Sequence, residues 1–375
     1  MKKYVVVSDS FKGTLSSREI CAIAREVIPA VRPDCEIVTI PVADGGEGTV
    51  DCFVEAIGAE PVTVTVSGPY GEPIEATYGR SGELAVIEMA AAAGLPLVGE
   101  RKNPEKTGTF GVGELMRHAI THGAKEILLG LGGSATNDGG CGAAAAMGVK
   151  FYDESGEAFI PVGGTLGKIR KIDAREAKER LGGVTVTVMC DVDNPLFGER
   201  GAACVFAPQK GADAAMVARL DEGLRDYARV LADSLGADVA AVPGSGAAGG
   251  MGAGCIAFFG ARLCSGIDAI LDAVRFEDHL TPGTLVITGE GKIDAQSAHG
   301  KVISGIARRT KAHGIPLVAL VGAIGDGADE LYSLGLTEIL SINPPDMPYA
   351  DCAAHASAYY EKRLRGFLEK ENAAF

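Results

Sequence analysis

The sequence predicts an α/β protein built around a mostly parallel sheet. Short apolar runs rich in β-branched residues recur along the chain and end in Gly, Asp or Ser, as strands buried on both faces of a sheet do. These runs cover residues 4–7, 36–40, 126–129, 184–189, 285–288, 317–321 and 338–342. Segments with a helical period lie between them, and alternation of strand and helix is typical of a parallel α/β sheet.

The first strand, 4–7, leads into a helix that we expect over residues 16–28. Ser16 and Glu19 have the spacing of a capping box, which marks a helix start. Two more helical patterns occupy residues 113–122 and 301–313.

The segment after the second strand follows a different pattern. Residues 61–66 alternate with period two into a turn, and residues 74–78 and 84–88 continue the alternation. Such a run predicts a small antiparallel meander. At the other end of the chain, residues 332–342 and 350–369 predict a last strand and a closing helix.

The length of 375 residues indicates two domains, at roughly 150 residues per domain. We expect a Rossmann-like, doubly wound α/β domain formed by residues 1–65 and 280–375. A smaller mixed α/β domain over residues 66–279 would be inserted in it.

Charge and composition exclude several classes of protein. Lys and Arg number 35 against 49 Asp and Glu, a net charge of −14. A chain this acidic is repelled by the phosphate backbone of nucleic acids and by anionic membranes. We therefore expect neither nucleic acid nor membrane as a partner. No apolar run is long enough to span a bilayer. The nine cysteines form no CxxC pair, and no targeting segment is visible, which together favour reduced thiols in a cytoplasmic protein.

The common catalytic motifs are absent. The sequence holds no GxxxxGK[ST] P-loop, no GxSxG elbow and no HExxH zinc motif. Residues 191–196 open like a calcium loop but lack its later glycine and glutamate. Residues 244–249 match GxGxxG, and this match alone carries an alternative function, a nicotinamide-dependent hydroxyacid dehydrogenase. No clear strand precedes it.

Acidic, glycine-rich loops are the features that point to chemistry. Glycine makes up 52 of the residues, about twice the usual share of ~7%. Most of these loops follow expected strands, at the sheet edge where α/β proteins bind ligands, and they cover residues 8–13, 41–48, 130–140, 190–195 and 289–294. A single acid in such a loop is more often a turn or helix cap. Together, however, glycine N–H groups, carboxylates and lysines suit phosphoryl transfer with Mg²⁺.

Seven motifs, in order along the chain, resemble the bacterial glycerate kinase family of the type without a P-loop. They are DSFKG at 9–13, PVADGGEGT at 41–49, GSATNDGG at 133–140, CDVDNPL at 190–196, PQKGA at 208–212, GAAGGMGAG at 246–254 and ITGEGKID at 287–294. The resemblance covers essentially the whole chain.

The resemblance implies an enzyme that phosphorylates D-glycerate with ATP and Mg²⁺. The branch that looks most similar is associated with 2-phospho-D-glycerate as product, and with glycerate, glyoxylate and aldarate metabolism. A kinase that forms 3-phosphoglycerate is the alternative product, and a small-hydroxyacid or nucleotide sensor on the same fold is the non-enzymatic alternative. The family fold implies two α/β domains with the site in the cleft between them. A homodimer is one candidate state of association, and the sequence does not decide it.

Chemistry on the motif positions suggests the candidate roles. Asp191 and Asp193 would be general base and magnesium ligand, in an order left open, with Lys12 as a further catalytic residue. Candidate substrate-binding residues are Asp9, Asp44, Glu47, Ser134, Asn137, Asp138 and Lys210. Candidate nucleotide-binding residues are Gly289, Glu290, Gly291 and Lys292. Asp294, with Asp193, would hold the metal, and residues 244–254 would pass close to the substrate or line a domain interface.

Overall fold

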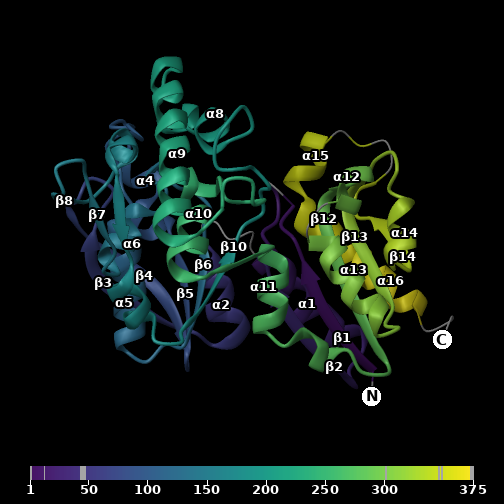
Figure 1. Cartoon of the computed structure of the whole chain (residues 1–375). Coiled ribbons are helices and arrows are strands. Elements are labelled where there is room, and N and C mark those ends of the chain that lie inside the picture. Colours follow the sequence, from purple (N-terminus) through teal and green to yellow (C-terminus); the bar gives the residue numbers. More distant parts are fainter. Residues whose placement is uncertain are drawn as a thin grey trace. The chain divides into compact units, whose positions relative to one another are not determined.

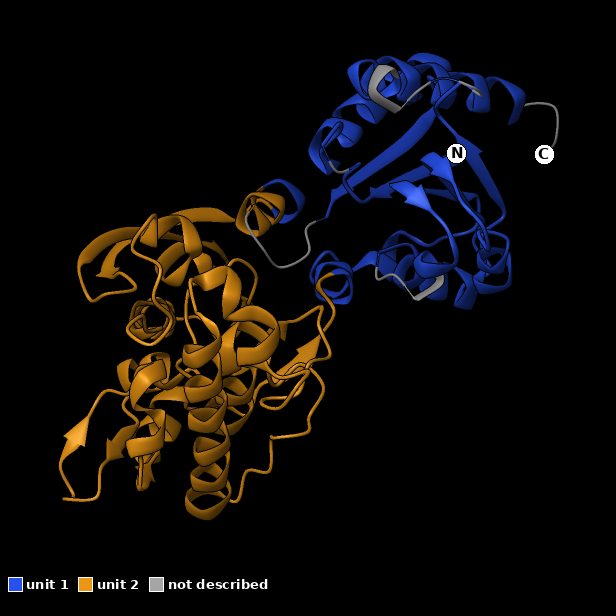
Figure 2. Ribbon diagram, turned by 90° about the horizontal axis from the view of Figure 1, so that it is seen from above, with its two compact units in different colours: residues 1–43, 55–57, 267–375 blue, residues 44–54, 58–266 orange. Residues whose placement is uncertain are grey.

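The computed structural model in Figure 1 describes residues 2–11, 13–42, 48–299, 302–344, 347 and 349–371. The chain forms two compact units, coloured separately in Figure 2. Residues 1–43, 55–57 and 267–375 make the first unit, and residues 44–54 and 58–266 make the second. Both are α/β, which confirms the predicted fold class.

The units divide at other residues than the sequence analysis expected. The expected boundaries were 65 and 279. β3 (Glu60–Ser67), however, pairs along its whole length with β4 of the second unit, and α11 (Gly266–Ala273) is tied to α13 of the first unit by ion pairs. The mixed unit is also the larger of the two, not the smaller, because it carries a second full sheet.

The first unit is built on one parallel five-stranded sheet in the order β14-β13-β12-β1-β2. Its strands are β1 (Lys2–Ser8), β2 (Cys35–Pro41), β12 (Thr284–Ile293), β13 (Leu317–Ile324) and β14 (Glu338–Ser341). Residues 4–7 of β1 are fully buried, as expected of a strand covered on both faces. The strand order turns back between β1 and β12, so this is a topological switch point.

Helices lie on both sides of this sheet in Figure 2. They are α1 (Ser17–Val31), α11, the 3₁₀ turn η3 (Phe276–His279), α12 (Ala295–His299), α13 (Val302–Ala312), α14 (Glu330–Leu334), α15 (Tyr349–Ala354) and α16 (Ala356–Glu371). The capping box of α1 is confirmed: the Ser16 hydroxyl accepts from Glu19 N–H at 3.2 Å, and Ser16 N–H donates to the Glu19 carboxylate at 2.7 Å.

The end of α16 is fastened to β1. The Tyr4 hydroxyl donates to Glu371 at 2.8 Å, and Lys2 pairs with the other oxygen of the same carboxylate at 2.5 Å. Burial and the neighbouring Glu371 raise the pKa of Tyr4 to about 12. Tyr360 and Leu364 of α16 share a core with Tyr4, so the two ends of the chain stabilise one unit together.

The second unit is built on a six-stranded sheet in the order β11-β10-β6-β5-β4-β3. Its strands are β3, β4 (Pro73–Ser81), β5 (Leu84–Glu88), β6 (Glu126–Gly130), β10 (Thr185–Met189) and β11 (Arg262–Cys264). β3, β4 and β5 pair antiparallel, which confirms the predicted meander. The other three strands, β6, β10 and β11, continue the sheet from β5 in parallel.

A small antiparallel sheet and several helices complete the second unit. The small sheet holds β7 (Lys150–Tyr152), β8 (Ala158–Phe159) and β9 (Lys171–Asp173). The helices are α2 (Thr49–Ile57, whose last turn belongs to the first unit), α3 (Ala90–Ala93), α4 (Leu95–Val98), α5 (Phe110–Thr121), α6 (Cys141–Ala146), η1 (Gly163–Lys168), α7 (Arg175–Leu181), α8 (Ala202–Phe206), η2 (Pro208–Lys210), α9 (Ala214–Leu235) and α10 (Ala247–Phe259). Among the described helices, none is both long and apolar enough to cross a membrane.

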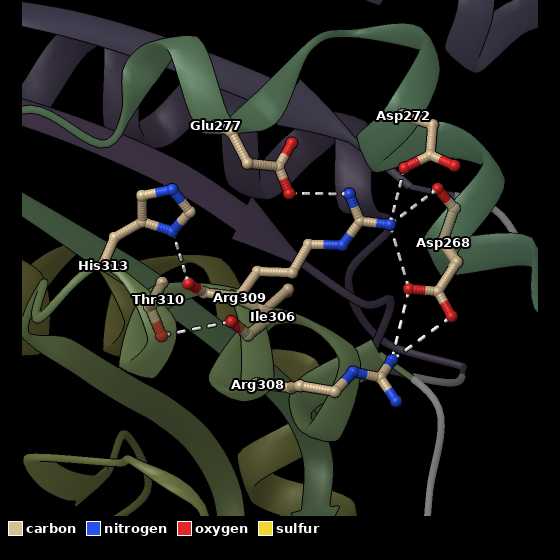
Figure 3. Close-up of polar contacts among 8 residues, drawn as sticks. All are labelled: Asp268, Asp272, Glu277, Ile306, Arg308, Arg309, Thr310 and His313. Carbon is tan, nitrogen blue, oxygen red and sulfur yellow. Dashed lines mark hydrogen bonds and ion pairs between the residues drawn. The ribbon is translucent and has the colours of Figure 1, made fainter.

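Arg309 of α13 holds α11 and η3 in the first unit (Figure 3). Its guanidinium contacts Asp268 at 3.0 Å, Asp272 at 2.8 Å and Glu277 at 2.9 Å, and only 15% of the side chain is exposed. Its neighbour Arg308 also contacts Asp268, at 3.2 Å, but 68% of that side chain is exposed. The shielded arginine should therefore contribute far more than the exposed one.

We expect Arg309→Met to lower the free energy of unfolding by about 2–4 kcal/mol, because it leaves three carboxylates without their shared cation. Arg308→Met is the matched control and should cost less than about 1 kcal/mol. Denaturant unfolding followed by circular dichroism measures both. Equal losses for the two variants would contradict this account of the cluster.

Candidate active site

Two pockets are lined by several of the described residues that the motifs singled out, one pocket in each unit. Each lies at the carboxyl ends of parallel strands, as the sequence analysis expected for ligand sites in α/β sheets.

The pocket of the first unit lies at the switch point between β1 and β12. It has a volume of about 360 Å³, and Asp9, Ser10, Glu290, Gly291 and Lys292 are among its lining residues. Asp9 N–H donates to Gly289 O at 2.9 Å, which fixes the loop after β1 against β12. The acidic loop after β1 and the last residues of β12 therefore meet at one edge of the sheet. The expected loop at 289–294 is in fact almost entirely strand, because β12 continues to Ile293.

Glycine is required where β12 and β13 approach each other beside this pocket. A Cβ on Gly289 would lie 2.0 Å from Leu320 O, and one on Gly322 would lie 2.4 Å from Gly291 O. Gly289 is buried within β12 and does not line the pocket, whereas Gly291 does. Gly289 therefore serves strand packing in this structure.

Some residues of the first unit differ from expectation. Lys292 pairs with Asp294 at 2.9 Å, and this pair lowers the pKa of Asp294 and raises that of Lys292. Asn343 lines the same pocket but was not predicted, and its side chain donates to Gly322 O at 2.7 Å. It follows the last strand, β14, so the rule that selected the other loops applies to it as well.

The pocket of the second unit lies where β6 and β10 end. It has a volume of about 420 Å³, and Gly132, Gly133, Ser134, Asp191 and Lys210 are among its lining residues. Gly133 has φ +73°, a conformation that residues other than glycine rarely adopt. This turn carries the chain from β6 to Ser134.

Lys210 is the buried cation of this pocket. It ends η2, only 2% of it is exposed, and its ammonium nitrogen donates to Ser134 Oγ at 2.8 Å and to Thr136 O at 2.6 Å. Burial lowers the pKa of Lys210 to about 7, although the charge of Asp138 acts in the opposite direction. Near neutral pH, a lysine with this pKa can be either neutral or charged, and a residue with so perturbed a pKa in a pocket is a strong candidate for a functional residue.

Asp138 is placed behind the pocket. It is fully buried and accepts hydrogen bonds from Thr109 N–H and Oγ at 2.8 Å each, and from Gly140 and Gly142 N–H at 3.1 and 3.2 Å. Burial raises its pKa despite these donors. The carboxylate therefore fixes the loop that leads into α6.

Asn137 is fully buried beside Asp138. Neither its amide nitrogen nor its amide oxygen has a hydrogen-bond partner among the described residues, and the same holds for the Thr136 hydroxyl. Buried polar groups of this kind normally have a hydrogen-bond partner, often an ordered water molecule. Asn137 does not itself line the pocket.

The two aspartates after β10 separate. Asp191 lines the pocket, is partly buried, and accepts from Gly266 N–H at 3.3 Å. The side chain of Asp193 is 76% exposed, pairs with Arg200 at 3.2 Å, and does not line the pocket. Although the two residues are only two positions apart, one carboxylate lies in the pocket and the other lies in solvent beside Arg200.

Residues 244–250 pack against the loop after β6. Ala248, Gly249 and Gly250 have φ of 52°, 68° and 89°, and Gly249 O accepts from Gly139 N–H at 3.0 Å. Ala248 lines the pocket. No strand leads directly into the GxGxxG match, because residues 236–246 connect it to α9. The dinucleotide-binding interpretation of this match is therefore wrong.

Three predicted site residues, Lys12, Asp44 and Glu47, lie outside the described residues.

The residues of the first pocket fit Mg²⁺ only together with a phosphate ligand. Within the described part of the chain, no three His, Cys, Asp or Glu side chains gather closely enough to hold a metal by themselves. Mg²⁺ in enzymes is commonly held by one or two carboxylates plus substrate phosphates. Asp9 and Glu290 in one pocket match that pattern, whereas Asp193 and Asp294 are each in an ion pair with a basic side chain.

Comparison with known families decides the identity. Residues 4–369 match the glycerate kinase family. The chain belongs to the glycerate kinase family. It is 42% identical over 368 residues to "Glycerate kinase" of Halalkalibacterium halodurans, covering 97% of each chain, and 43% identical over 343 residues to "Glycerate 2-kinase" of Escherichia coli, covering 91% and 90%.

A solved structure agrees with the fold of this glycerate kinase family member. It is the "Crystal structure of putative glycerate kinase 2" from Salmonella typhimurium LT2, which is 40% identical, covers 99% of this chain and 98% of its own, and superposes with a TM-score of 0.87. The resemblance stated from the motifs is confirmed, and the protein is a kinase with a hydroxyl acceptor.

Lys210 should make the stability of the protein depend on pH. The folded state holds a neutral amine above a pKa of about 7, while an ordinary lysine stays protonated to 10.5. Between these values the unfolded chain binds more protons, so this group makes the wild type more stable as pH rises. Lys210→Met removes the buried charge, so its stability relative to wild type should be greatest near pH 6 and should fall by a few kcal/mol towards pH ~10.

Urea unfolding at several pH values measures this difference. Lys178→Met, which changes an exposed lysine of α7, is the control and should differ from wild type by the same small amount throughout. If the Lys210→Met difference is also constant with pH, the neutral amine is not present in the folded state.

The left-handed turn at 248–250 gives a second matched pair. Ala248→Gly should raise the free energy of unfolding by about 1 kcal/mol, because alanine is strained at φ 52°. Gly249→Ala should lower it by several kcal/mol, since its Cβ would lie 2.1 Å from Thr136 O. Thermal unfolding measures both, and destabilisation by Ala248→Gly would contradict the turn geometry.

Proposed function

We propose that this protein is an ATP-dependent D-glycerate kinase that forms 2-phospho-D-glycerate. The pocket of the second unit carries the proposal, because the charged side chains among its lining residues are one lysine, Lys210, and one aspartate, Asp191. A hydroxyacid carries a carboxylate and a hydroxyl, which need one cation and one base. The E. coli relative named glycerate 2-kinase supports the 2-position. A 3-phosphoglycerate product is the alternative.

The pocket of the first unit suits the nucleotide. It occupies the switch point of a doubly wound sheet, where such sheets bind nucleotides, and Glu290, Gly291 and Lys292 at the end of β12 line it. In this proposal Gly291 offers its backbone to the phosphates, Lys292 offsets their charge, and Gly289 keeps β12 against β13. Asp9 lines the same pocket and is kept as a candidate substrate-binding residue.

The pocket of the second unit suits the hydroxyacid. Asp191 would accept the proton of the attacking hydroxyl as its oxygen bonds to the γ-phosphorus, while the bond from phosphorus to the leaving oxygen of ADP breaks. Ser134 would donate to the substrate. Asn137 and Asp138 would keep the loop after β6 in place from behind. Asp193 lies outside the pocket lining, so we assign the base to Asp191.

Mg²⁺ would be held by the nucleotide phosphates together with carboxylates of the first pocket. When bound, it neutralises charge on the phosphate oxygens. Asp9 and Glu290 line that pocket. Before Asp294 or Asp193 could bind the metal, it would have to release its present ion-pair partner, which is Lys292 for Asp294 and Arg200 for Asp193.

The remaining assignments follow from the family. Lys12 would stabilise the transferred phosphoryl group, and Asp44 and Glu47 would contact substrate. The nine cysteines, all described and none in a disulfide, are consistent with a reducing cytoplasm. As part of this proposal, the enzyme would act in glycerate, glyoxylate and aldarate metabolism. A homodimer is the candidate state of association.

Phosphorus NMR of the protein with D-glycerate, ATP and Mg²⁺ tests the activity. A new ester signal split as a doublet identifies phosphate on the single-proton C2, and a triplet identifies C3. We expect the doublet. A triplet would support the alternative product, and binding of glycerate without ADP release would support the sensor.

Asp191→Asn and Asp193→Asn test which acid is the base. Asp191→Asn should lower kcat by roughly 10²–10⁴-fold, the usual contribution of a general base. Asp193→Asn, an exposed carboxylate, should lower it less than about threefold. Steady-state kinetics with a coupled ADP assay gives both values. Near-normal turnover of folded Asp191→Asn would remove Asp191 from the chemistry.

A further inference from the structure

Lys210 is buried without an anionic partner at bonding distance. No carboxylate of the described residues lies within 4.0 Å of its nitrogen. Its two hydrogen-bond partners, Ser134 Oγ and Thr136 O, are neutral oxygens. A charged ammonium in such surroundings is costly. A neutral amine is satisfied there, since it can donate to Thr136 O and accept from the Ser134 hydroxyl.

Few ionisable groups face Lys210. Asp138, in the loop after β6, favours the ammonium form through its charge. Asp191 and Cys190, which follow β10, line the same pocket. On η2 itself the preceding residues are uncharged, and Lys102, against whose backbone Gly211 packs, is exposed.

We propose that Lys210 binds the carboxylate of the hydroxyacid as an ammonium ion and takes up a proton from solution when it does so. This inference rests on the proposed function and identifies which group of the substrate Lys210 contacts. The pocket suits an anion because the ammonium group of Lys210 lies in its lining. The partners of that ammonium among the described residues, Ser134 Oγ and Thr136 O, are neutral, so a substrate carboxylate would supply the missing negative charge. One unit of negative charge in the substrate matches one lysine.

Two other roles for Lys210 make different demands on the pocket. A triphosphate carries several negative charges, and Lys210 is the one basic side chain among the described lining residues. A general base must reach the hydroxyl, but Asp191 already offers a partly exposed carboxylate for that purpose. The carboxylate of the substrate is therefore the group whose single negative charge matches the single basic side chain among the described lining residues.

The test is calorimetric titration of the wild-type protein with D-glycerate, without ATP, in buffers of different ionisation enthalpy. The proton uptake should approach one per glycerate at about pH 8.5 and fall towards zero at about pH 5.5, where Lys210 is already charged. This measurement does not depend on whether any variant folds.

Lys210→Met should abolish the uptake and weaken D-glycerate binding by about 10–100-fold, the usual effect of losing a hydrogen bond to a charged group. Binding of glyceramide, the neutral amide analogue, should change far less. Lys178→Met is the matched control and should behave as wild type in both titrations.

The outcomes separate this inference from the proposed function. If the wild type phosphorylates D-glycerate but binds it without proton uptake at pH ~8.5, the inference is overturned and the proposed function stands. The inference is also overturned, with the proposed function intact, if Lys210→Met lowers kcat alone and leaves glycerate binding unchanged, which would make Lys210 a base. If the wild type neither binds nor phosphorylates D-glycerate, the proposed function fails as well.

Discussion

The parallel pairing of β1 with β12 is the constraint on which the first unit depends. It joins residues 3–6 to residues 284–287, segments from opposite ends of the chain. The entropy of closing so long a loop rises only slowly with its length, so a whole second unit can lie between the two strands. The pairing also creates the switch point, where Asp9 N–H meets Gly289 O and the first pocket forms.

The same geometric rule produces both pockets. Parallel strands end at one edge, so the loop after β1 meets the end of β12 in the first unit. In the second unit the loops after β6 and β10 converge in the same way. Close backbone contacts then fix the loops: a side chain on Gly249 would collide with Thr136 O, and one on Gly289 with Leu320 O. These two glycines are therefore required by backbone packing beside the pockets.

The two units treat buried charge in opposite ways. Arg309 is shielded but surrounded by three carboxylates, so its charge stabilises the fold. Lys210 is more deeply buried, and its hydrogen-bond partners among the described residues are neutral oxygens, so in its charged form it opposes folding. A folded protein keeps such a destabilising group where binding or catalysis uses it. The contrast with Arg309 supports the proposal that Lys210 serves binding, not stability.

The sequence by itself determined the fold class, the β3-β4-β5 meander, the capping box of α1 and the family, because these depend on local periodicity and on contiguous motifs. It also identified Ser134, Asp191, Lys210 and Glu290 as candidate site residues, since each belongs to one of the seven motifs. Tertiary structure decided the rest. It buried Asp138 behind the loop that Asp138 stabilises, and it turned Asp193 to solvent beside Arg200. It also left Lys210 without a carboxylate partner among the described residues. Burial and charge pairing depend on which distant segments pack together, and neither the spacing of residues nor their type records that.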